Sequence, residues 1–119
     1  MLNLDTHIFI HALNDGLTER ERKLLNREAW SISAMVLWEI SKLFQHGKIE
    51  MDIYSTEFSE ALDKIHVWPL TFEIAKQSVN LDFKSDPADE VIAATSIVHR
   101  LPLLTRDIRI KKSRIVPLA

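Results

Sequence analysis

Short apolar segments that alternate with longer helical ones constrain the fold of this chain more than any other feature. The short segments, at residues 1–4, 31–33, 66–70 and 101–105, have the length and composition of buried strands. Each is followed within a few residues by a segment with helical periodicity. This alternation predicts a parallel sheet that is covered by helices on both faces, an α/β sandwich.

Capping and turn residues set the expected limits of the helices. Thr18 and Glu21 have the spacing of a capping box, and Gly47 suits the left-handed backbone position that often follows a helix. The turn signal at residues 14–16 ends the first helix. We therefore expect helices at residues 6–13, 18–30, 34–47, 55–65, 71–80 and 88–100, and a last strand at 114–118.

The composition is that of an ordinary folded domain, and it excludes several classes of protein. At 119 residues, 46% of them hydrophobic and 27% charged, the chain is expected to form one domain over residues 1–119. No apolar run reaches the ~20 residues that span a bilayer, and the first residues lack a basic leader, so a cytoplasmic location is expected. Because cysteine is absent, any metal site must use oxygen or imidazole ligands.

Acidic residues follow two of the predicted strands. Asp5 comes directly after residues 1–4, and Asp107 comes two residues after 101–105. The carboxyl ends of parallel strands meet at one edge of a sheet, which is where such folds bind ligands. Each aspartate taken alone is more simply explained as a helix N-cap. Taken together, they predict that carboxylates from separate segments gather at this edge.

Glu39 lies on the apolar face of its predicted helix. It shares that face with Val36, Ile40 and Leu43. An unpaired buried carboxylate costs several kcal/mol, so Glu39 needs a cation, a hydrogen-bond network or a metal ion as its partner. Lys42 is an ordinary alternative partner, and the sequence alone does not decide between it and a metal ion.

Three acids crowd the start of the last predicted helix, in the segment SDPADEVIAATS. Pro87 is favoured at the first helical position, which makes Asp86 the N-cap and Asp89 the third helical residue. Asp89 falls on the same stripe as the buried residues that follow it, whereas Glu90 lies about 100° further round the helix. Asp86 is therefore expected to cap the helix in a supporting role, and Asp89 to point into the site.

The candidate site thus contains four acids, namely Asp5, Glu39, Asp89 and Asp107. Carboxylates gathered in one place repel one another, and such a cluster normally needs a divalent cation. Ligands that are all oxygen atoms suit Mg²⁺ or Mn²⁺. A cation held in this way activates water and stabilises a leaving oxygen, so the acids predict metal-dependent hydrolysis of phosphodiester bonds.

Three segments, LDTHIFI, SAMVLWEISKL and DPADEVIAATSIVHRLPLLTRD, resemble the signature blocks of PIN-domain ribonucleases, and most of all the VapC-type toxins. They follow one another in order over essentially the whole chain. The resemblance implies a three-layer α/β/α sandwich with a central parallel sheet, and a Mg²⁺- or Mn²⁺-dependent endoribonuclease that is the toxin of a toxin–antitoxin pair. It also implies that Asp5, Glu39, Asp89 and Asp107 are the catalytic and metal-binding residues, accompanied by the hydroxyl of Thr105.

The resemblance further implies an RNA substrate, a cognate antitoxin and a homodimer. One departure is Glu90, where members of the family usually carry arginine, so an expected cation beside the site is missing. A basic segment near the C-terminus is a candidate RNA contact, although a solvated surface explains it equally well. Its cations are Arg106, Arg109, Lys111, Lys112 and Arg114.

Three alternative interpretations fit the sequence less well. A non-catalytic PIN-fold module would bind RNA or a protein without cutting, but all four acids are present. His7 and His11 lie one helical turn apart and could bind zinc, but they lack a third ligand. An aspartyl phosphotransferase would use Asp5 as its nucleophile, but it would want a second aspartate where the chain has His7.

Overall fold

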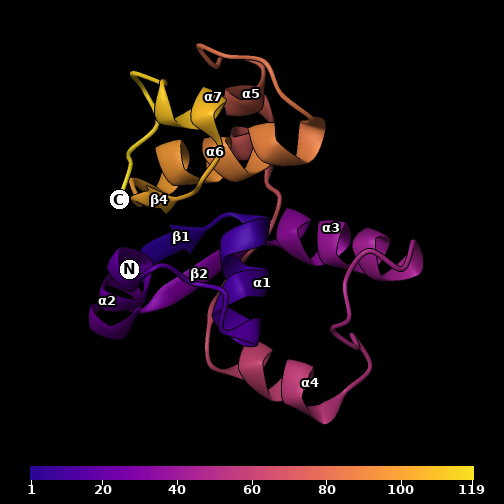
Figure 1. The fold of residues 1–119 in the computed structure, drawn as a ribbon. Helices are drawn as coiled ribbons and strands as arrows, with labels where there is room; N and C mark the ends of the chain where they lie inside the picture. Colours follow the sequence, from indigo (N-terminus) through magenta and orange to yellow (C-terminus); the bar gives the residue numbers. More distant parts are fainter.

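A four-stranded parallel sheet forms the centre of the molecule in the computed structural model, which describes residues 1–119 (Figure 1). Its strands lie in the order β3-β2-β1-β4, and each pairs in parallel with its neighbours. The strands are β1 (Leu2–Leu4), β2 (Trp30–Ser33), β3 (His66–Trp68) and β4 (Leu103–Leu104). The parallel sheet predicted from the sequence is confirmed.

Helices cover both faces of the sheet. Their bounds are α1 (Thr6–Asn14), α2 (Glu19–Arg27), α3 (Ala34–Gln45), α4 (Thr56–Asp63), α5 (Phe72–Ser78), α6 (Pro87–His99) and α7 (Ile108–Lys111). Figure 1 shows α5, α6 and α7 on one side of the strands, and α1 and α4 on the other. This is the three-layer α/β/α arrangement that was expected. None of the helices combines the length and apolar character needed to cross a membrane.

The hydrophobic core fills the space between the sheet and the helices. Phe9 of α1 is fully buried, and its ring meets that of Phe58 of α4 edge to face, with 6.5 Å between the centroids. The other large side chains that are fully buried include Leu4, Ile8, Ile32, Ile40, Ile74, Ile92, Leu103, Leu104 and Ile110. Packing of this kind fixes where α1 and α6 begin relative to the strand ends.

A buried amide fixes α6 over the centre of the sheet. Asn3 of β1 donates from Nδ2 to the Ile92 carbonyl oxygen at 3.2 Å and to Ser96 Oγ at 2.9 Å. Because Asp89 precedes Ile92 by about one helical turn, these bonds set Asp89 above the carboxyl end of β1. The central sheet thereby positions an acid that lies more than 80 residues away in sequence.

The boundary between α2 and β2 differs from the prediction. The helix ends at Arg27 rather than near residue 30, and Trp30 begins β2, where its partner is Leu2. The indole N–H of Trp30 donates to the Leu25 carbonyl oxygen at 2.8 Å, which satisfies the end of α2. Pairing with β1 therefore overrides the local helical pattern.

The C-terminal region also differs from the prediction. The strand expected at 114–118 is reduced to one bridge, between Leu103 and Leu118. The short helix α7 was not assigned from the sequence; it begins after Asp107. The strand expected at 66–70 is shorter, since β3 ends before Pro69, and it lies at the edge of the sheet, where a proline without an N–H is tolerated.

Candidate metal and active site

Four acidic side chains approach the carboxyl edge of the sheet from different elements. Asp5 directly follows β1 and is the N-cap of α1, while Asp107 follows β4 and is the N-cap of α7. Glu39 comes from α3, the helix that follows β2, and Asp89 from the first turn of α6. Each acid therefore comes from a different segment of the chain.

Asp5 is the most buried of the four acids, with 6% of its surface exposed. Its Oδ1 accepts a hydrogen bond from the Thr6 N–H at 2.8 Å, and its Oδ2 accepts one from Thr105 Oγ1 at 2.5 Å. Burial raises the pKa of Asp5, and nearby Asp107 adds to the rise, although the two hydrogen bonds act in the opposite sense. Both oxygens are therefore held in fixed directions.

Glu39 is half-buried and accepts a hydrogen bond from the hydroxyl of Thr6. Burial raises its pKa, and the neighbouring Asp89 and Asp5 raise it further. Lys42 makes no ion pair with Glu39, and its ammonium lies 3.4 Å from Gln45 Oε1 instead. The ordinary explanation of Glu39 as half of an ion pair with Lys42 is therefore wrong.

Asp89 is half-buried, and its Oδ2 accepts a hydrogen bond from Ser85 Oγ at 2.9 Å. Burial raises the pKa of Asp89, and the charges of Asp5, Asp107 and Asp86 raise it further. The acids therefore influence one another although they come from distant parts of the chain.

The cap of α6 corrects one prediction. Asp86 occupies the N-cap position before Pro87, as expected, but its exposed side chain makes no capping hydrogen bond. Pro87 has no N–H to offer, and the longer side chain of Glu90 reaches back instead to the Ser85 N–H at 3.3 Å. The start of the helix is thus tied down through Ser85 rather than through Asp86.

Asp107 serves as a helix cap and also faces the other acids. Its Oδ1 accepts hydrogen bonds from the N–H groups of Arg109 at 2.8 Å and Ile110 at 3.3 Å. Its own N–H donates to Thr105 Oγ1 at 3.0 Å. Thr105 therefore joins Asp5 to Asp107 through one hydroxyl group. Asp107 therefore caps α7 and belongs to the acidic cluster at the same time.

Asp5 and Asp89 lie close enough to Asp107 for its charge to raise their pKa, and Glu39 lies close enough to Asp5 and Asp89 for theirs to raise its own. No three histidine, aspartate or glutamate side chains form a ready-made coordination group. The donor set still fits a hard divalent cation, since it offers carboxylate oxygens whose repulsion such a cation relieves. His7 lies near Asp5 and Glu39 and offsets part of their repulsion, so it belongs to this neighbourhood.

Three polar residues of the site were not predicted as such. Thr6 holds both Asp5 and Glu39, Ser85 holds Asp89, and His7 lies near Asp5 and Glu39. Each adjoins a predicted acid or cap in sequence. The bond from Thr6 to Glu39 joins two helices that are distant in sequence, so sequence position carried no signal of it, whereas Ser85 and Asp89 are only four residues apart.

The predicted basic segment does not behave as one surface. Arg106 is turned toward Glu21, where its guanidinium makes a two-pronged ion pair. Arg109 contacts Asp107, with 3.5 Å between Nη2 and Oδ2. The cations Lys111, Lys112 and Arg114 are exposed. The side chain of Arg106 is therefore occupied within the protein, whereas the exposed cations remain available to a ligand.

The stability of the metal-free protein is expected to fall as pH rises above about 4, which is near the ordinary pKa values of 3.8 for Asp and 4.5 for Glu. Burial raises the folded-state pKa of Asp5, Glu39 and Asp89, so their stabilising contribution is complete below the unfolded pKa and is lost as pH rises through the folded pKa. Glu21 has the opposite sign, because its pKa is lowered to about 2 and its contribution is lost only as pH falls toward that value. Urea unfolding in EDTA between pH 4 and 8 measures this slope, and a flat profile would contradict it.

The fold and the placement of the acids define the class of protein. The chain belongs to the PIN domain family, whose model, described as "PIN domain", matches residues 3–115. The family predicted from the sequence motifs is confirmed. None of the curated protein sequences compared with the chain matches it.

Solved structures with the same fold include chains of a toxin–antitoxin complex and of two DNA-bound VapBC complexes. A toxin–antitoxin complex from Klebsiella pneumoniae contains a chain with 21% identity and a TM-score of 0.75, with 100% of this chain and 97% of that chain covered. A chain of VapBC2 from Rickettsia felis, bound to a promoter DNA fragment, has 18% identity and a TM-score of 0.76 over 100% and 98%. A chain of DNA-bound VapBC from Salmonella typhimurium has 19% identity and a TM-score of 0.65 over 100% and 98%. These likenesses establish a shared fold.

Proposed function

We propose that this protein is a metal-dependent endoribonuclease, and that it is the VapC-type toxin of a toxin–antitoxin pair. The observation that carries the proposal is the convergence of Asp5, Glu39, Asp89 and Asp107 from four separate elements. Burial raises the pKa of Asp5, Glu39 and Asp89, and the charges of neighbouring acids raise it further. Membership of the PIN family and the shared fold with chains of toxin–antitoxin complexes support the same conclusion.

The four acids would hold Mg²⁺ or Mn²⁺, because hard divalent cations prefer oxygen ligands. The bound cation would supply Lewis acidity, which activates water and stabilises the departing ribose oxygen. The hydroxyl of Thr105 and the N–H of Thr6 fix the direction of both oxygens of Asp5. The Thr6 hydroxyl directs one oxygen of Glu39 and leaves the other free. Carboxylates that are oriented in advance need little reorganisation when they bind a ligand.

Glu39 is proposed either to bind the cation or to orient the attacking water and accept its proton. Burial raises the pKa of Glu39, and a carboxylate with a raised pKa binds a proton more readily, which suits a general base. In the reaction, the water oxygen bonds to phosphorus while the bond from phosphorus to the leaving ribose oxygen breaks. The proton that the water loses is the one that Glu39 would accept.

RNA contacts are proposed for the cations that follow Asp107 in the sequence. Lys111, Lys112 and Arg114 are exposed, and Arg109 has 58% of its side chain exposed. Phosphate contacts of this kind give affinity that decreases as salt concentration rises. Cleavage of a short RNA is therefore expected to show a higher KM at high salt.

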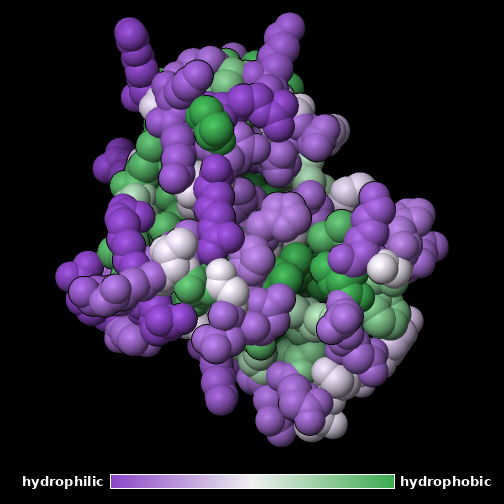
Figure 2. All heavy atoms as spheres, viewed as in Figure 1, coloured by the Kyte–Doolittle hydropathy of each residue, from purple (hydrophilic) through white to green (hydrophobic).

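The antitoxin is proposed to occupy a cavity of about 900 Å³ between α1, the end of α3 and α4. Figure 2 shows hydrophobic residues gathered in the hollow between α3 and α4. The apolar lining consists of Ile10, Leu13, Leu43, Ile49, Met51 and Phe58. His7 also lines the cavity, and it lies near Asp5 and Glu39, so a bound segment would end beside the acids. If a co-purified antitoxin binds Leu13→Asp as tightly as the parent, this location is wrong.

A homodimer in the cytoplasm is also proposed. Large apolar side chains remain exposed on and beside α5, where Phe72 is 76% and Val79 is 81% exposed. Exposed apolar residues of this kind are typical of surfaces that are covered in an assembly. Sedimentation equilibrium of the purified chain checks the proposal, since a single species of 13.8 kDa would contradict it.

The decisive experiment incubates purified, antitoxin-free protein with defined RNAs in Mg²⁺, in Mn²⁺ or in EDTA. Cleavage is expected with either cation, to stop in EDTA and to return when Mg²⁺ is added in excess. The melting temperature should rise with Mn²⁺ in the absence of RNA, because the cation binds only the folded state. Cleavage that persists in EDTA would contradict the metal mechanism. Failure to bind Mn²⁺ or to cut any RNA would favour the non-catalytic PIN-fold module.

A further inference from the structure

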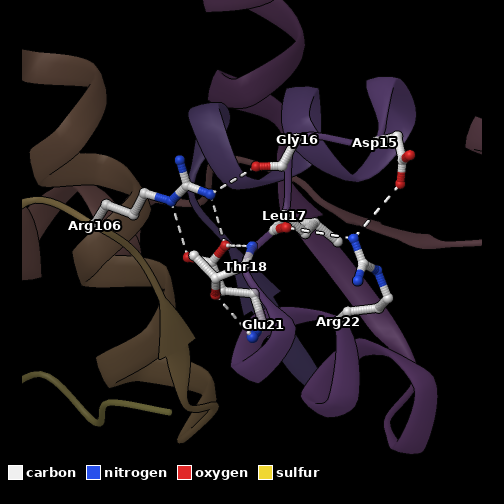
Figure 3. Close-up of polar contacts among 7 residues, drawn as sticks. All are labelled: Asp15, Gly16, Leu17, Thr18, Glu21, Arg22 and Arg106. Atoms are coloured by element: carbon white, nitrogen blue, oxygen red, sulfur yellow. Dashed lines mark hydrogen bonds and ion pairs between the residues drawn. The ribbon is translucent and has the colours of Figure 1, made fainter.

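Arg106 separates two residues of the candidate site but points away from it. Its neighbours are Thr105, which donates to Asp5, and Asp107, which caps α7. The Arg106 guanidinium instead reaches toward the start of α2, as Figure 3 shows. The backbone at residues 105–107 is therefore held in two ways. The Thr105 hydroxyl bonds to Asp5 in the site, and the Arg106 guanidinium bonds to Glu21 away from it.

The bond away from the site is a two-pronged ion pair with Glu21. Arg106 Nε donates to Glu21 Oε2 at 2.9 Å, and Nη2 donates to Glu21 Oε1 at 2.7 Å. Nη2 also donates to the Gly16 carbonyl oxygen at 2.9 Å. Paired geometry of this kind fixes the orientation as well as the distance of both groups. The guanidinium thus connects the loop before α2 to the loop after β4.

Glu21 is itself immobilised by α2. The residue is 6% exposed, and its Oε1 accepts from the Thr18 N–H at 2.8 Å, while its own N–H donates to Thr18 Oγ1 at 3.2 Å. This is the capping box that the sequence predicted. The hydrogen bonds from the Arg106 guanidinium lower the pKa of Glu21, whereas burial raises it. The effect of the guanidinium is the larger, and the pKa is lowered to about 2. Glu21 is a rigid, charged anchor.

The segment that Arg106 anchors has little support of its own. β4 contains two residues and α7 four, and helices this short are not stable by themselves. Asp107 must nevertheless present its carboxylate to the other acids while it caps α7. Such a short segment requires fixed points next to Asp107, one toward the site and one away from it. Thr105 provides the one on the side of the site, and Arg106 provides the other.

We propose that Glu21, acting through Arg106, is a positioning residue for the metal site, and that it sets the direction in which Asp107 presents its carboxylate. The inference rests on the proposed function, since it concerns the same acids. It assigns a role to Glu21, which the sequence had marked only as a helix cap, and it gives Arg106 a role other than contact with RNA.

Calorimetric titration of the antitoxin-free chain with Mn²⁺ tests the proposal directly. Glu21→Gln keeps the size of the side chain and an acceptor for Thr18, but it loses the charge that orients Arg106. Its Kd for Mn²⁺ is expected to rise about tenfold, which is the lower end of the effect of losing a partner of a metal ligand. Glu19→Gln is the matched control, because Glu19 is exposed on the same helix and pairs only with Lys23. An unchanged Kd in Glu21→Gln would overturn the proposal.

Arg106→Lys separates positioning from contact with RNA. Lysine keeps the positive charge for phosphate but lacks the two-pronged geometry that Glu21 requires. Positioning predicts that this variant lowers kcat with little change in the KM for RNA, and that combining it with Glu21→Gln adds little further loss. A raised KM with unchanged kcat would assign Arg106 to the RNA and overturn the proposal.

Hydrogen exchange of the metal-free chain gives a reading that depends on neither RNA nor metal. Faster exchange of the amides of residues 107–111 is expected in Glu21→Gln and not in Glu19→Gln, with the rest of the chain unaffected. A uniform increase over the chain would indicate a general loss of stability and would overturn the proposal. Failure of the parent to bind Mn²⁺ would overturn the proposed function. Normal binding in both the parent and Glu21→Gln would overturn only this inference.

Discussion

Asp89→Asn is expected to lower the rate of RNA cleavage by at least about a hundredfold. Loss of a residue that merely supports a metal ligand costs about 10- to 100-fold, so loss of a ligand itself should cost more. Asparagine preserves the shape of the side chain and an oxygen for the Ser85 hydroxyl, but it removes the charge that attracts a cation. The increase in melting temperature caused by Mn²⁺ should disappear in the same variant.

The matched control for this substitution is Asp63→Asn. Asp63 is an exposed aspartate at the end of α4, so the same chemical change is made far from the acids. It should leave cleavage and the response to Mn²⁺ unchanged. Metal-free Asp89→Asn should be at least as stable as the parent above about pH 5, because one of the mutually repelling charges is gone. If it binds Mn²⁺ and cuts RNA as the parent does, Asp89 is not a ligand.

Sequence patterns sufficed to place the elements that carry the acids. Asp5 and Asp107 could be located because a parallel sheet brings all its carboxyl ends to one edge, and that rule depends only on recognising strands. Asp89 could be separated from Asp86 and Glu90 because Pro87 fixes the helix start and hence the direction of each side chain. These predictions rely on local periodicity, which the sequence records directly.

Contacts between distant segments could not be predicted in the same way. The sequence offered Lys42 as a partner for Glu39 because the two are one turn apart, but the hydroxyl of Thr6 from another helix takes that place. Arg106 was grouped with the cations around it, although its partner Glu21 lies 85 residues earlier. Charge patterns reveal which groups need partners, but only the packing of the elements decides which partners they meet.

Phe9→Ala is expected to lower the free energy of unfolding by about 3–5 kcal/mol, the usual cost of truncating a fully buried phenylalanine. Phe9 is 0% exposed and joins α1 to the ring of Phe58 in α4. A domain of this size has only about 5–15 kcal/mol of stability, so the variant should be close to unfolding at about 25 °C. Urea denaturation in the presence of EDTA measures the difference without any contribution from bound cation.

Phe72→Ala makes the same chemical change at a side chain that is 76% exposed in the single chain, so at a concentration too low for dimers it should cost less than about 0.5 kcal/mol. Equal losses in the two variants would contradict the burial of α1. The core substitution should also weaken Mn²⁺ binding in the molecules that remain folded. Thr6, the first residue of α1, directs Asp5 and Glu39 through its N–H and its hydroxyl, and it stays in place only while the helix is packed. In this fold the site depends on the core because Asp5, Asp89 and Asp107 stand at the starts of helices that the core holds in place.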